Sequence, residues 1–220
     1  MGLSLVTGAN RGIGLAICSQ LHDRGDQVVA VCRTPSPELS ALGVEIIDGI
    51  DVSDDASIQT LPSRMDNRPI DVLVNNAGRL RRDGLTQPDD DEVLAQFVVN
   101  AMGPLRVTRA LLPLLSSGSK IAHITSRMGS VADNTSGGMY GYRMSKAALN
   151  AAAKSMTVDL GPKGIMVAVL HPGFVRTDMT GGNGLVDAPE SAAGLIARID
   201  GLTMENSGTF WHMNGEVLPW

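Results

Sequence analysis

Residues 3–14 read LSLVTGANRGIG, a short apolar run that ends in a turn containing three glycines. Gly8 permits a tight turn, Gly12 lets the backbone approach a phosphate, and Gly14 lets the following helix pack closely on the strand. The first turn of that helix offers N–H donors and the positive end of its dipole to an anion. The stretch therefore predicts a strand, a glycine turn and a helix that bind a pyrophosphate. A purely structural turn is the alternative, because the glycines depart from the GxGxxG spacing.

The rest of the chain alternates short apolar runs, rich in Val and Ile, with longer segments of helical periodicity. This alternation is typical of a parallel sheet with helices on both faces, so we expect a doubly wound, Rossmann-type α/β fold with seven strands. Pro104 and Pro113 should bend the third helix or end it early. In such a sheet the ligand lies beyond the carboxyl ends of the strands. The expected strands are 3–7, 27–32, 44–48, 70–75, 119–125, 165–170 and 209–213, and the expected helices are 12–24, 53–66, 90–116, 142–160 and 188–201.

Composition narrows the class of protein. The 220 residues, 43% of them apolar, suffice for one sizeable core, so we expect a single domain over 1–220. A net charge of -5 and the lack of a Lys/Arg-rich run argue against nucleic-acid binding. Cys18 and Cys32 lack zinc-ligand spacing, which predicts core residues in a reducing compartment and no metal site. The chain has no leader pattern and no apolar stretch of ~18 residues, so we expect a cytoplasmic protein without a membrane span.

Further motifs follow the glycine turn in a recognisable order. The motifs are Asn75-Asn76-Ala77-Gly78 after the fourth strand, Asn100 in the next helix, Ser126 after the fifth strand, the YxxxK pair Tyr142 and Lys146, and Pro172-Gly173 with Thr177 after the sixth strand. Together with TGxxxGxG, these motifs make the chain similar to the short-chain dehydrogenase/reductase superfamily from Leu3 to its C-terminus. The wording SRMGS at 126–130 and GYRMSK at 141–146 resembles the branch of C-factor-like and sniffer-like carbonyl reductases.

Tyr142 and Lys146 are four residues apart, which places both on one face of the expected helix. A phenol titrates near ~10 and needs a nearby cation to transfer a proton at neutral pH, so this pair is the candidate proton donor and electrostatic partner. The alternatives are an ordinary aromatic residue at a helix start and an exposed surface charge. Tyr140 is a poorer donor because the residue four positions later is Met144. The resemblance implies that Lys146 also holds the nicotinamide ribose hydroxyls.

Two polar residues complete the expected catalytic group. Ser126 follows its apolar strand directly and would donate a hydrogen bond to the substrate carbonyl oxygen as negative charge develops there. We favour Ser126 over Ser130, which lies deeper in the loop, although a serine that caps the strand end is the alternative. The resemblance implies that Asn100 bends its helix and holds a water that connects Lys146 to solvent. A polar residue near a proline kink is the alternative for Asn100.

The second strand ends at Val31-Cys32-Arg33, with no carboxylate to bond a ribose 2′-hydroxyl. Arg33 offers a planar, charged fork to a 2′-phosphate and Arg11 would flank the same group, which favours NADPH over NADH; two solvated arginines are the alternative. Asp51 and Val52 resemble the pair that the family sets beside the adenine, and a simple helix cap also explains Asp51. The resemblance implies further cofactor contacts at Gly8, Asn10, Gly12, Ile13, Gly14, Asn75, Ala77, Gly78, Tyr142, Lys146, Pro172, Gly173, Val175 and Thr177.

The substrate side is short in this chain. Residues 178–187, which include Gly181, Gly182 and Gly184, predict a short, mobile lid over an open pocket that accepts varied carbonyl compounds. Arginines follow the NNAG motif at positions 79, 81 and 82, where they either attract an anionic substrate or lie in a solvated loop. His123 and His171 lack a nucleophile partner and are expected to be structural.

The resemblance thus implies NADPH-dependent reduction of an aldehyde, ketone or quinone to the alcohol, or the reverse oxidation. One alternative is a 3-oxoacyl carrier-protein reductase, which shares the same core motifs. A second alternative is a cofactor-binding signalling protein of C-factor type, whose chemistry is incidental. The resemblance also implies a homodimer or homotetramer formed through the helices near 90–116 and 142–160.

Overall fold

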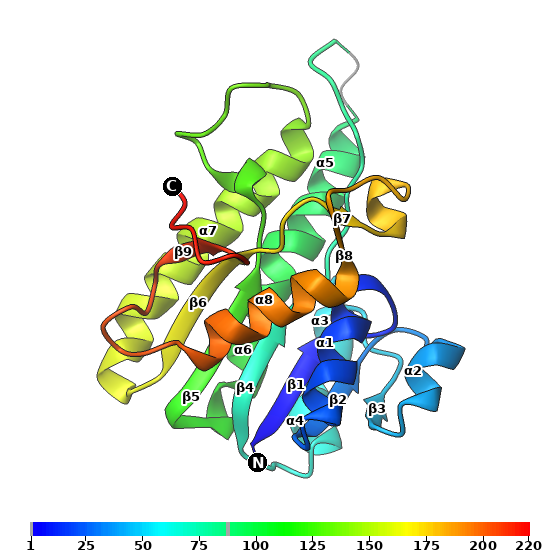
Figure 1. Cartoon of the computed structure of the whole chain (residues 1–220), viewed down its shortest axis with the longest axis vertical. Helices are drawn as coiled ribbons and strands as arrows, with labels where there is room; N and C mark the ends of the chain where they lie inside the picture. Colours follow the sequence, from blue (N-terminus) through cyan, green and yellow to red (C-terminus); the bar gives the residue numbers. More distant parts are fainter. Residues whose placement is uncertain (1, 87–88) are drawn as a thin grey trace.

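The computed structural model describes residues 2–86 and 89–220. Seven strands form one sheet in the order β3-β2-β1-β4-β5-β6-β9, and all their pairings are parallel (Figure 1). The expected doubly wound α/β fold is therefore confirmed. The strands are β1 Leu3–Thr7, β2 Gln27–Val31, β3 Glu45–Ile47, β4 Ile70–Asn75, β5 Leu115–Ile124, β6 Met166–His171 and β9 Phe210–His212.

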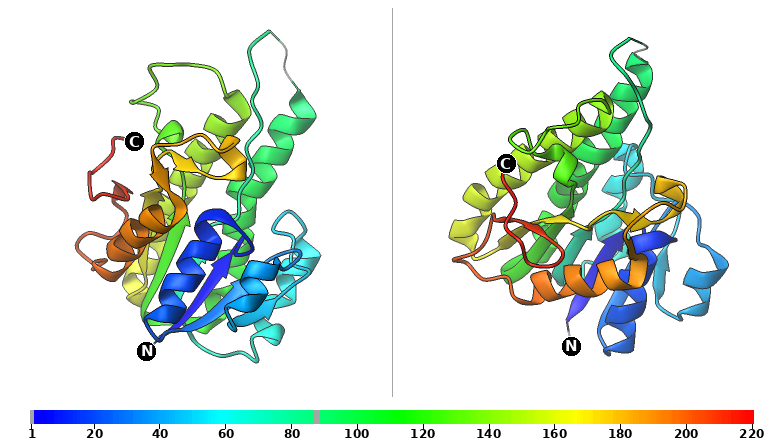
Figure 2. Two further views of the ribbon diagram at one scale, coloured as in Figure 1. Left: turned by 45° about the vertical axis from the view of Figure 1, so that its right-hand side comes forward. Right: turned by 45° about the horizontal axis from the view of Figure 1, so that its top comes forward.

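Helices cover both faces of the sheet, because alternate residues of each strand point to opposite sides. Figure 2 shows helices on both sides of the sheet. On β1, Leu5 packs into one apolar cluster with helices α3, α4, α6 and α7, whereas Val6 packs into a second cluster with α1, α2 and α8. No helix among the described residues is long and apolar enough to cross a membrane. The helices are α1 Gly12–Asp23, α2 Pro37–Ala41, α3 Asp55–Gln59, α4 Leu61–Arg64, α5 Asp90–Phe97, α6 Gly103–Leu111, α7 Tyr140–Leu160 and α8 Ala188–Asp200.

The strand order reverses beside β1. From β1 the chain first builds outward through β2 and β3, then returns to the other side of β1 with β4 and continues to β5, β6 and β9. The connections after β1 and β4 therefore leave in opposite directions and open a crevice at the carboxyl ends of these two strands. Thr7 ends β1 and Asn75 ends β4, so the glycine turn and the NNAG motif face each other there.

Two expected helices are interrupted at prolines. The helix expected at 53–66 is divided into α3 and α4, with Pro62 in the first turn of α4. The helix expected at 90–116 continues from α5 through a π turn at Val98–Met102 into α6, and Pro113 lies in the 3₁₀ turn that ends it. Pro104 has no N–H for the carbonyl of residue 100, so regular α-helical bonding cannot run through this point. Because the helix ends early, β5 begins at Leu115 rather than at 119.

The segment expected to be a mobile lid is tied down at its base. Two short strands, β7 Val175–Arg176 and β8 Val186–Asp187, pair in parallel, and the Arg176 Nε atom lies 2.6 Å from Asp187 Oδ1. A Cβ atom on Gly184 would clash with the Arg176 backbone nitrogen, so this glycine serves close backbone packing rather than flexibility. The expected mobility of residues 178–187 stays a prediction.

Candidate active site

A groove of about 880 Å³ runs along the carboxyl ends of the strands. It is bordered by the glycine turn, the ends of β2 and β4, and the connection that follows β7. Most of the residues predicted to hold a dinucleotide line it. These residues are Gly8, Asn10, Arg11, Gly12, Ile13, Arg33, Asp51, Val52, Ala77, Gly78 and Thr177.

The glycine turn needs its glycines for close packing as well as for backbone conformation. Gly8 has φ +65°, and a Cβ atom there would lie 2.7 Å from the Ala77 Cα atom. A Cβ atom on Gly14 would clash with the Gly8 carbonyl oxygen and lie 2.5 Å from Asn76 Nδ2. Gly12 has φ +54° and faces Thr177 across the groove. The predicted roles of Gly8 and Gly14 in tight turning and close packing therefore match the geometry.

Asn76 ties the two sides of the crevice together. Its Nδ2 atom donates to the carbonyl oxygens of Thr7 at 3.0 Å and Gly8 at 3.1 Å, and its backbone N–H donates to the Thr7 hydroxyl. Asn75, which the sequence analysis assigned to the cofactor, instead points into the core and donates to the Thr108 hydroxyl at 3.1 Å. The assignment is corrected: Asn76 lines the groove and Asn75 does not.

Other predicted cofactor residues lie behind the groove wall. Val175 is buried in β7, and Gly14 packs beneath the glycine turn. Neither residue lines the groove, and the same holds for Pro172 and Gly173 at the end of β6. These four residues pack behind the groove wall and support it. Their placement therefore favours a structural role over direct contact with a ligand in the groove.

Both arginines predicted to meet a 2′-phosphate are paired with carboxylates at the groove. Arg33 Nη1 lies 3.8 Å from Asp51 Oδ2, and Arg11 Nη1 lies 3.3 Å from Asp178 Oδ2. Partial burial raises the pKa of Asp51, but the hydrogen bonds from Ser53 and the charge of Arg33 outweigh it and keep that pKa below its usual value. Both ion pairs are well exposed to solvent, so each guanidinium group can exchange its carboxylate for a bound anion at a small cost in free energy.

Tyr142 and Lys146 lie in the first two turns of α7, just beyond the groove. Lys146 is 4% exposed, its Nζ atom donates to the Ile124 carbonyl at 2.9 Å, and it lies 5.9 Å from the centroid of the Tyr142 ring. A Cβ atom on Gly78, which lines the groove, would lie 3.8 Å from Lys146 Nζ, so this ammonium lies just behind the groove wall at Gly78. The structure thus brings the predicted pair to one end of the predicted dinucleotide groove.

Burial controls the protonation of this pair. It raises the pKa of the Tyr142 phenol to about 12 and lowers the pKa of the Lys146 ammonium to about 8. The Ser126 side chain opposes part of the rise at Tyr142. The sequence analysis expects Lys146 to lower the Tyr142 pKa, but burial dominates in the structure and raises that pKa. The phenol is therefore a protonated hydrogen donor at neutral pH.

The choice between two serines is decided by where their hydroxyl groups point. Ser126 follows β5, accepts the Met128 N–H at 3.1 Å, and lies close enough to Tyr142 to influence the pKa of its phenol. Ser130 Oγ instead donates to the Trp220 carbonyl at 3.1 Å and accepts the Asp133 N–H. Ser126 is therefore the serine beside the phenol, in agreement with the sequence analysis.

Asn100 lies at the centre of the π turn and is fully buried. Its Oδ1 atom accepts the Arg79 N–H at 2.8 Å, and its Nδ2 atom donates to the Arg79 carbonyl at 2.8 Å and to the Ser145 hydroxyl at 3.0 Å. Both amide hydrogens are thus used by protein acceptors. The side chain fixes the loop after NNAG against α7, and the predicted role of holding a water remains a prediction.

Asp83 and Gln96 position the catalytic helix, and the sequence analysis missed both. Asp83 Oδ2 accepts the Gly141 N–H at 2.7 Å, which satisfies a free donor at the start of α7. The Asp83 carbonyl accepts the Met139 N–H at 3.3 Å, and Gln96 Oε1 accepts the Arg81 N–H at 3.0 Å. No sequence signal marks this cap, because Asp83 and Gly141 lie 58 residues apart.

The two histidines near the site are neutral; His123 is fully buried and His171 is half-buried. Burial, followed by the charge of Lys146, lowers the pKa of His123 to about 4. Burial and the neighbouring His212 ring lower the pKa of His171 to about 3. No group of three His, Cys, Asp or Glu residues that could hold a metal occurs in the described part of the chain.

A groove of about 880 Å³ that lies beside a buried phenol and ammonium is the arrangement of an oxidoreductase that acts on CH–OH or C=O groups. The chain belongs to the short-chain dehydrogenase family, whose model matches residues 3–185. It is 42% identical over 226 residues to 1-hydroxy-2-glutathionyl-2-methyl-3-butene dehydrogenase of Rhodococcus sp. (strain AD45), with 100% of both chains covered. It is 50% identical over 155 residues to the C-signal of Myxococcus xanthus, which covers 69% of this chain and 93% of that protein.

Solved structures place the chain in the carbonyl reductase branch of this family. The carbonyl reductase Sniffer of D. melanogaster superimposes with a TM-score of 0.94 at 33% identity, over 100% of both chains. The NADPH-bound carbonyl reductase from chicken fatty liver superimposes with a TM-score of 0.90 at 30% identity, over 100% of this chain and 99% of that one. The resemblance stated from the sequence motifs is confirmed at the level of family and branch.

Proposed function

We propose that this protein catalyses the NADPH-dependent reduction of a carbonyl group in an aldehyde, ketone or quinone, and the reverse oxidation of the alcohol. The observation that carries the proposal is the buried, protonated Tyr142 phenol, which lies together with Ser126 and Lys146 beside the groove. A carbonyl oxygen that gains electrons needs a proton donor in place, and this phenol is positioned for that role.

The groove fits a nicotinamide dinucleotide. Its glycine turn presents backbone without side chains where Cβ atoms would fill the space, and the first turn of α1 has no acidic residue to repel a phosphate. Gly8, Gly12 and Ile13 would hold the pyrophosphate, and Asp51 with Val52 would border the adenine. When bound, the cofactor supplies or accepts the hydride.

The protein's own residues handle the proton and the charge. Ser126 would donate a hydrogen bond to the substrate oxygen, and the Tyr142 O–H bond would break as its proton passes to that oxygen. The phenolate left behind is stabilised by the Lys146 ammonium, whose attraction strengthens in a site from which water is excluded. Because both side chains are buried, the proton passes between fixed groups rather than through bulk solvent.

The same geometry supports NADPH over NADH. Arg33 follows β2, where the ribose of a bound dinucleotide would lie, and no carboxylate occupies the end of that strand. Exchange of the exposed Asp51 partner for a 2′-phosphate would form a charge-assisted, bidentate contact. The NADPH-bound chicken carbonyl reductase is in accord with this preference. Fluorescence titration with both cofactors tests it, and tighter binding of NADH would overturn it.

Substitution of Tyr142 by Phe tests the catalytic proposal. Tyr142→Phe should lower kcat for NADPH oxidation by about 10²- to 10⁴-fold, because it removes the general acid. Cofactor affinity should stay within about twofold, since the ring and its packing remain. Tyr140→Phe is the matched control: this tyrosine is 39% exposed on the same helix and should tolerate the change. A Tyr142→Phe enzyme with near-normal rates on a panel of aldehydes, ketones and quinones would refute the assignment.

A second candidate function is signalling of the C-signal type, favoured by the 50% identity to that Myxococcus protein. In this case the cofactor groove would be used for binding, and turnover would be incidental. The Tyr142→Phe variant separates the two functions in a strain that lacks the wild-type protein. Restoration of the wild-type phenotype by this variant favours signalling, whereas failure to restore it favours the enzyme.

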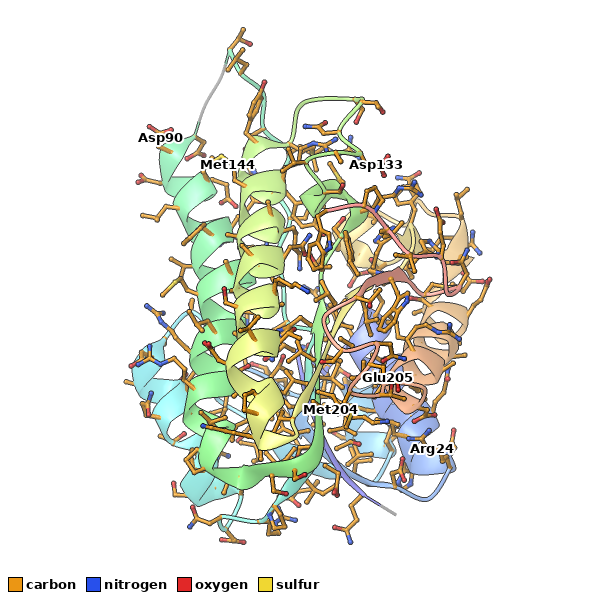
Figure 3. The ribbon with its side chains drawn as sticks, turned by 90° about the vertical axis from the view of Figure 1, so that its left-hand side faces the viewer. Arg24, Asp90, Asp133, Met144, Met204 and Glu205 are labelled. Atoms are coloured by element: carbon orange, nitrogen blue, oxygen red, sulfur yellow. The ribbon has the colours of Figure 1, made fainter. Side chains whose placement is uncertain are left out.

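We further propose a cytoplasmic homodimer or homotetramer assembled through the faces of α5, α6 and α7. These helices lie side by side along one flank of the molecule (Figure 3). Leu94, Met144 and Val158 expose apolar side chains on them, which is the kind of surface that association covers. Light scattering tests this by comparing the molecular mass of the wild type with that of Val158→Glu. The wild type should have the mass of an oligomer and the variant a lower mass, and the same mass for both proteins would count against the interface.

A further inference from the structure

Five arginines line the groove, and four of them are matched by carboxylates. These four pairs are Arg11 with Asp178, Arg33 with Asp51, Arg79 with Glu92, and Arg176 with Asp187. Within residues 2–86 and 89–220, no carboxylate lies within ion-pair distance of the fifth, Arg81. The uncompensated positive charge of the groove wall is therefore concentrated at Arg81, and the adjacent exposed Arg82 adds to it.

Arg81 lies on the substrate side of the groove. It follows β4, on the opposite side of β1 from β2 and Arg33, where the 2′-phosphate is expected. Its own N–H is bound by Gln96, and two residues later Asp83 caps the helix that carries Tyr142. The charge thus belongs to the catalytic end of the groove rather than to the phosphate-binding end.

The backbone around Arg81 is held rigidly. Asn100 binds both the N–H and the carbonyl of Arg79, and Gln96 binds the N–H of Arg81. Both amide side chains come from the buried face of the α5–π-turn helix. A guanidinium on a fixed backbone loses less conformational freedom when it binds an anion than one on a free loop.

We propose that Arg81 binds a carboxylate of the substrate, so that the preferred substrates are carbonyl compounds that also carry a carboxylate. This inference rests on the carbonyl reduction proposed above. A guanidinium matches a carboxylate with two parallel N–H···O bonds, and an uncharged carbonyl compound would leave Arg81 without a partner. The aldehyde or ketone would lie toward Tyr142 and Ser126, and its carboxylate toward the loop after NNAG.

Two aldehydes that differ in charge and by one methyl group test the proposal: 4-formylbenzoate and its methyl ester. NADPH oxidation by the wild type should show a kcat/KM about tenfold higher for the anion, the value of one charge-assisted hydrogen bond. Arg81→Gln should remove this preference through KM, with the rate on the ester unchanged. Arg81→Glu should reverse the preference. The control is Arg109→Gln, an exposed arginine on α6 far from the groove, which should behave as the wild type.

Calorimetry with benzoate and methyl benzoate, in the presence of NADPH, tests the same contact without turnover. Benzoate should bind to the wild type, and Arg81→Gln should weaken its binding about tenfold. If neither aldehyde is reduced but benzoate binding depends on Arg81, the proposed reaction fails and the anion site stands. Equal loss of activity on both aldehydes, a raised KM for NADPH in Arg81→Gln, or benzoate binding that ignores Arg81 would each overturn the proposal.

Discussion

Replacement of Lys146 by Met should make the protein more stable while it removes catalysis. The Lys146 ammonium is buried, and its pKa falls from 10.5 to about 8 on folding. Since the unfolded chain binds this proton more tightly, wild-type stability should rise with pH between about 8 and 10.5. Below that window folding carries the full cost of burying the charge, and above it the cost vanishes.

The magnitude follows from the shift. At pH 7 the cost of burying the Lys146 charge is about 3 kcal/mol, and at pH 9.5 about 1 kcal/mol remains. Met keeps most of the side-chain volume but loses the hydrogen bond to the Ile124 carbonyl, which costs about 1 kcal/mol. The free energy of unfolding of Lys146→Met should therefore exceed that of the wild type by about 2 kcal/mol at pH 7 and by about zero at pH 9.5. His123 and His171 stay neutral throughout this range, since the pKa of each is lowered well below 7.

Urea unfolding followed by circular dichroism at the two pH values measures this difference. Lys154→Met is the control, because Lys154 lies exposed on the same helix and its replacement should change stability by less than about 0.5 kcal/mol at either pH. A Lys146→Met variant that is less stable than the wild type at pH 7, or a stability difference that does not vary with pH, would refute the reasoning.

Three further substitutions probe the rest of the site. Ser126→Ala should lower kcat for carbonyl reduction about 10²-fold, whereas Ser130→Ala should stay within about twofold in steady-state assays, and equal losses would contradict the assignment. Gly14→Ala should destabilise the fold by about 1–3 kcal/mol in urea and weaken NADPH binding, because its Cβ would clash with the glycine turn; wild-type values for both would exclude this packing role. Asp83→Ala should cost about 0.5–2 kcal/mol through loss of the α7 cap and lower kcat, and an unchanged melting temperature would show that the cap is dispensable.

Sequence reasoning was most successful where local geometry decides. All seven strands of the main sheet lie where apolar runs predicted them, and the YxxxK spacing places Tyr142 and Lys146 on one face of α7. It was least successful where short polar segments acquire structure from distant partners. Helix α2 and the pair β7 and β8 were not predicted, because elements this short are stabilised by tertiary contacts rather than by their own periodicity.

By itself the sequence determined the glycine turn, the order of motifs at the strand ends and the pairing of a phenol with an ammonium. These depend on periodicities of 2 and about 3.6 residues and on the conformational freedom of glycine, which are properties of the local chain. Only the tertiary structure decided that Asn76 and not Asn75 faces the groove and that burial sets the protonation of the Tyr142 phenol. It also decided that no carboxylate within residues 2–86 and 89–220 pairs with Arg81. Side-chain direction, burial and charge pairing depend on neighbours that are dozens of residues away, so spacing along the chain cannot supply them.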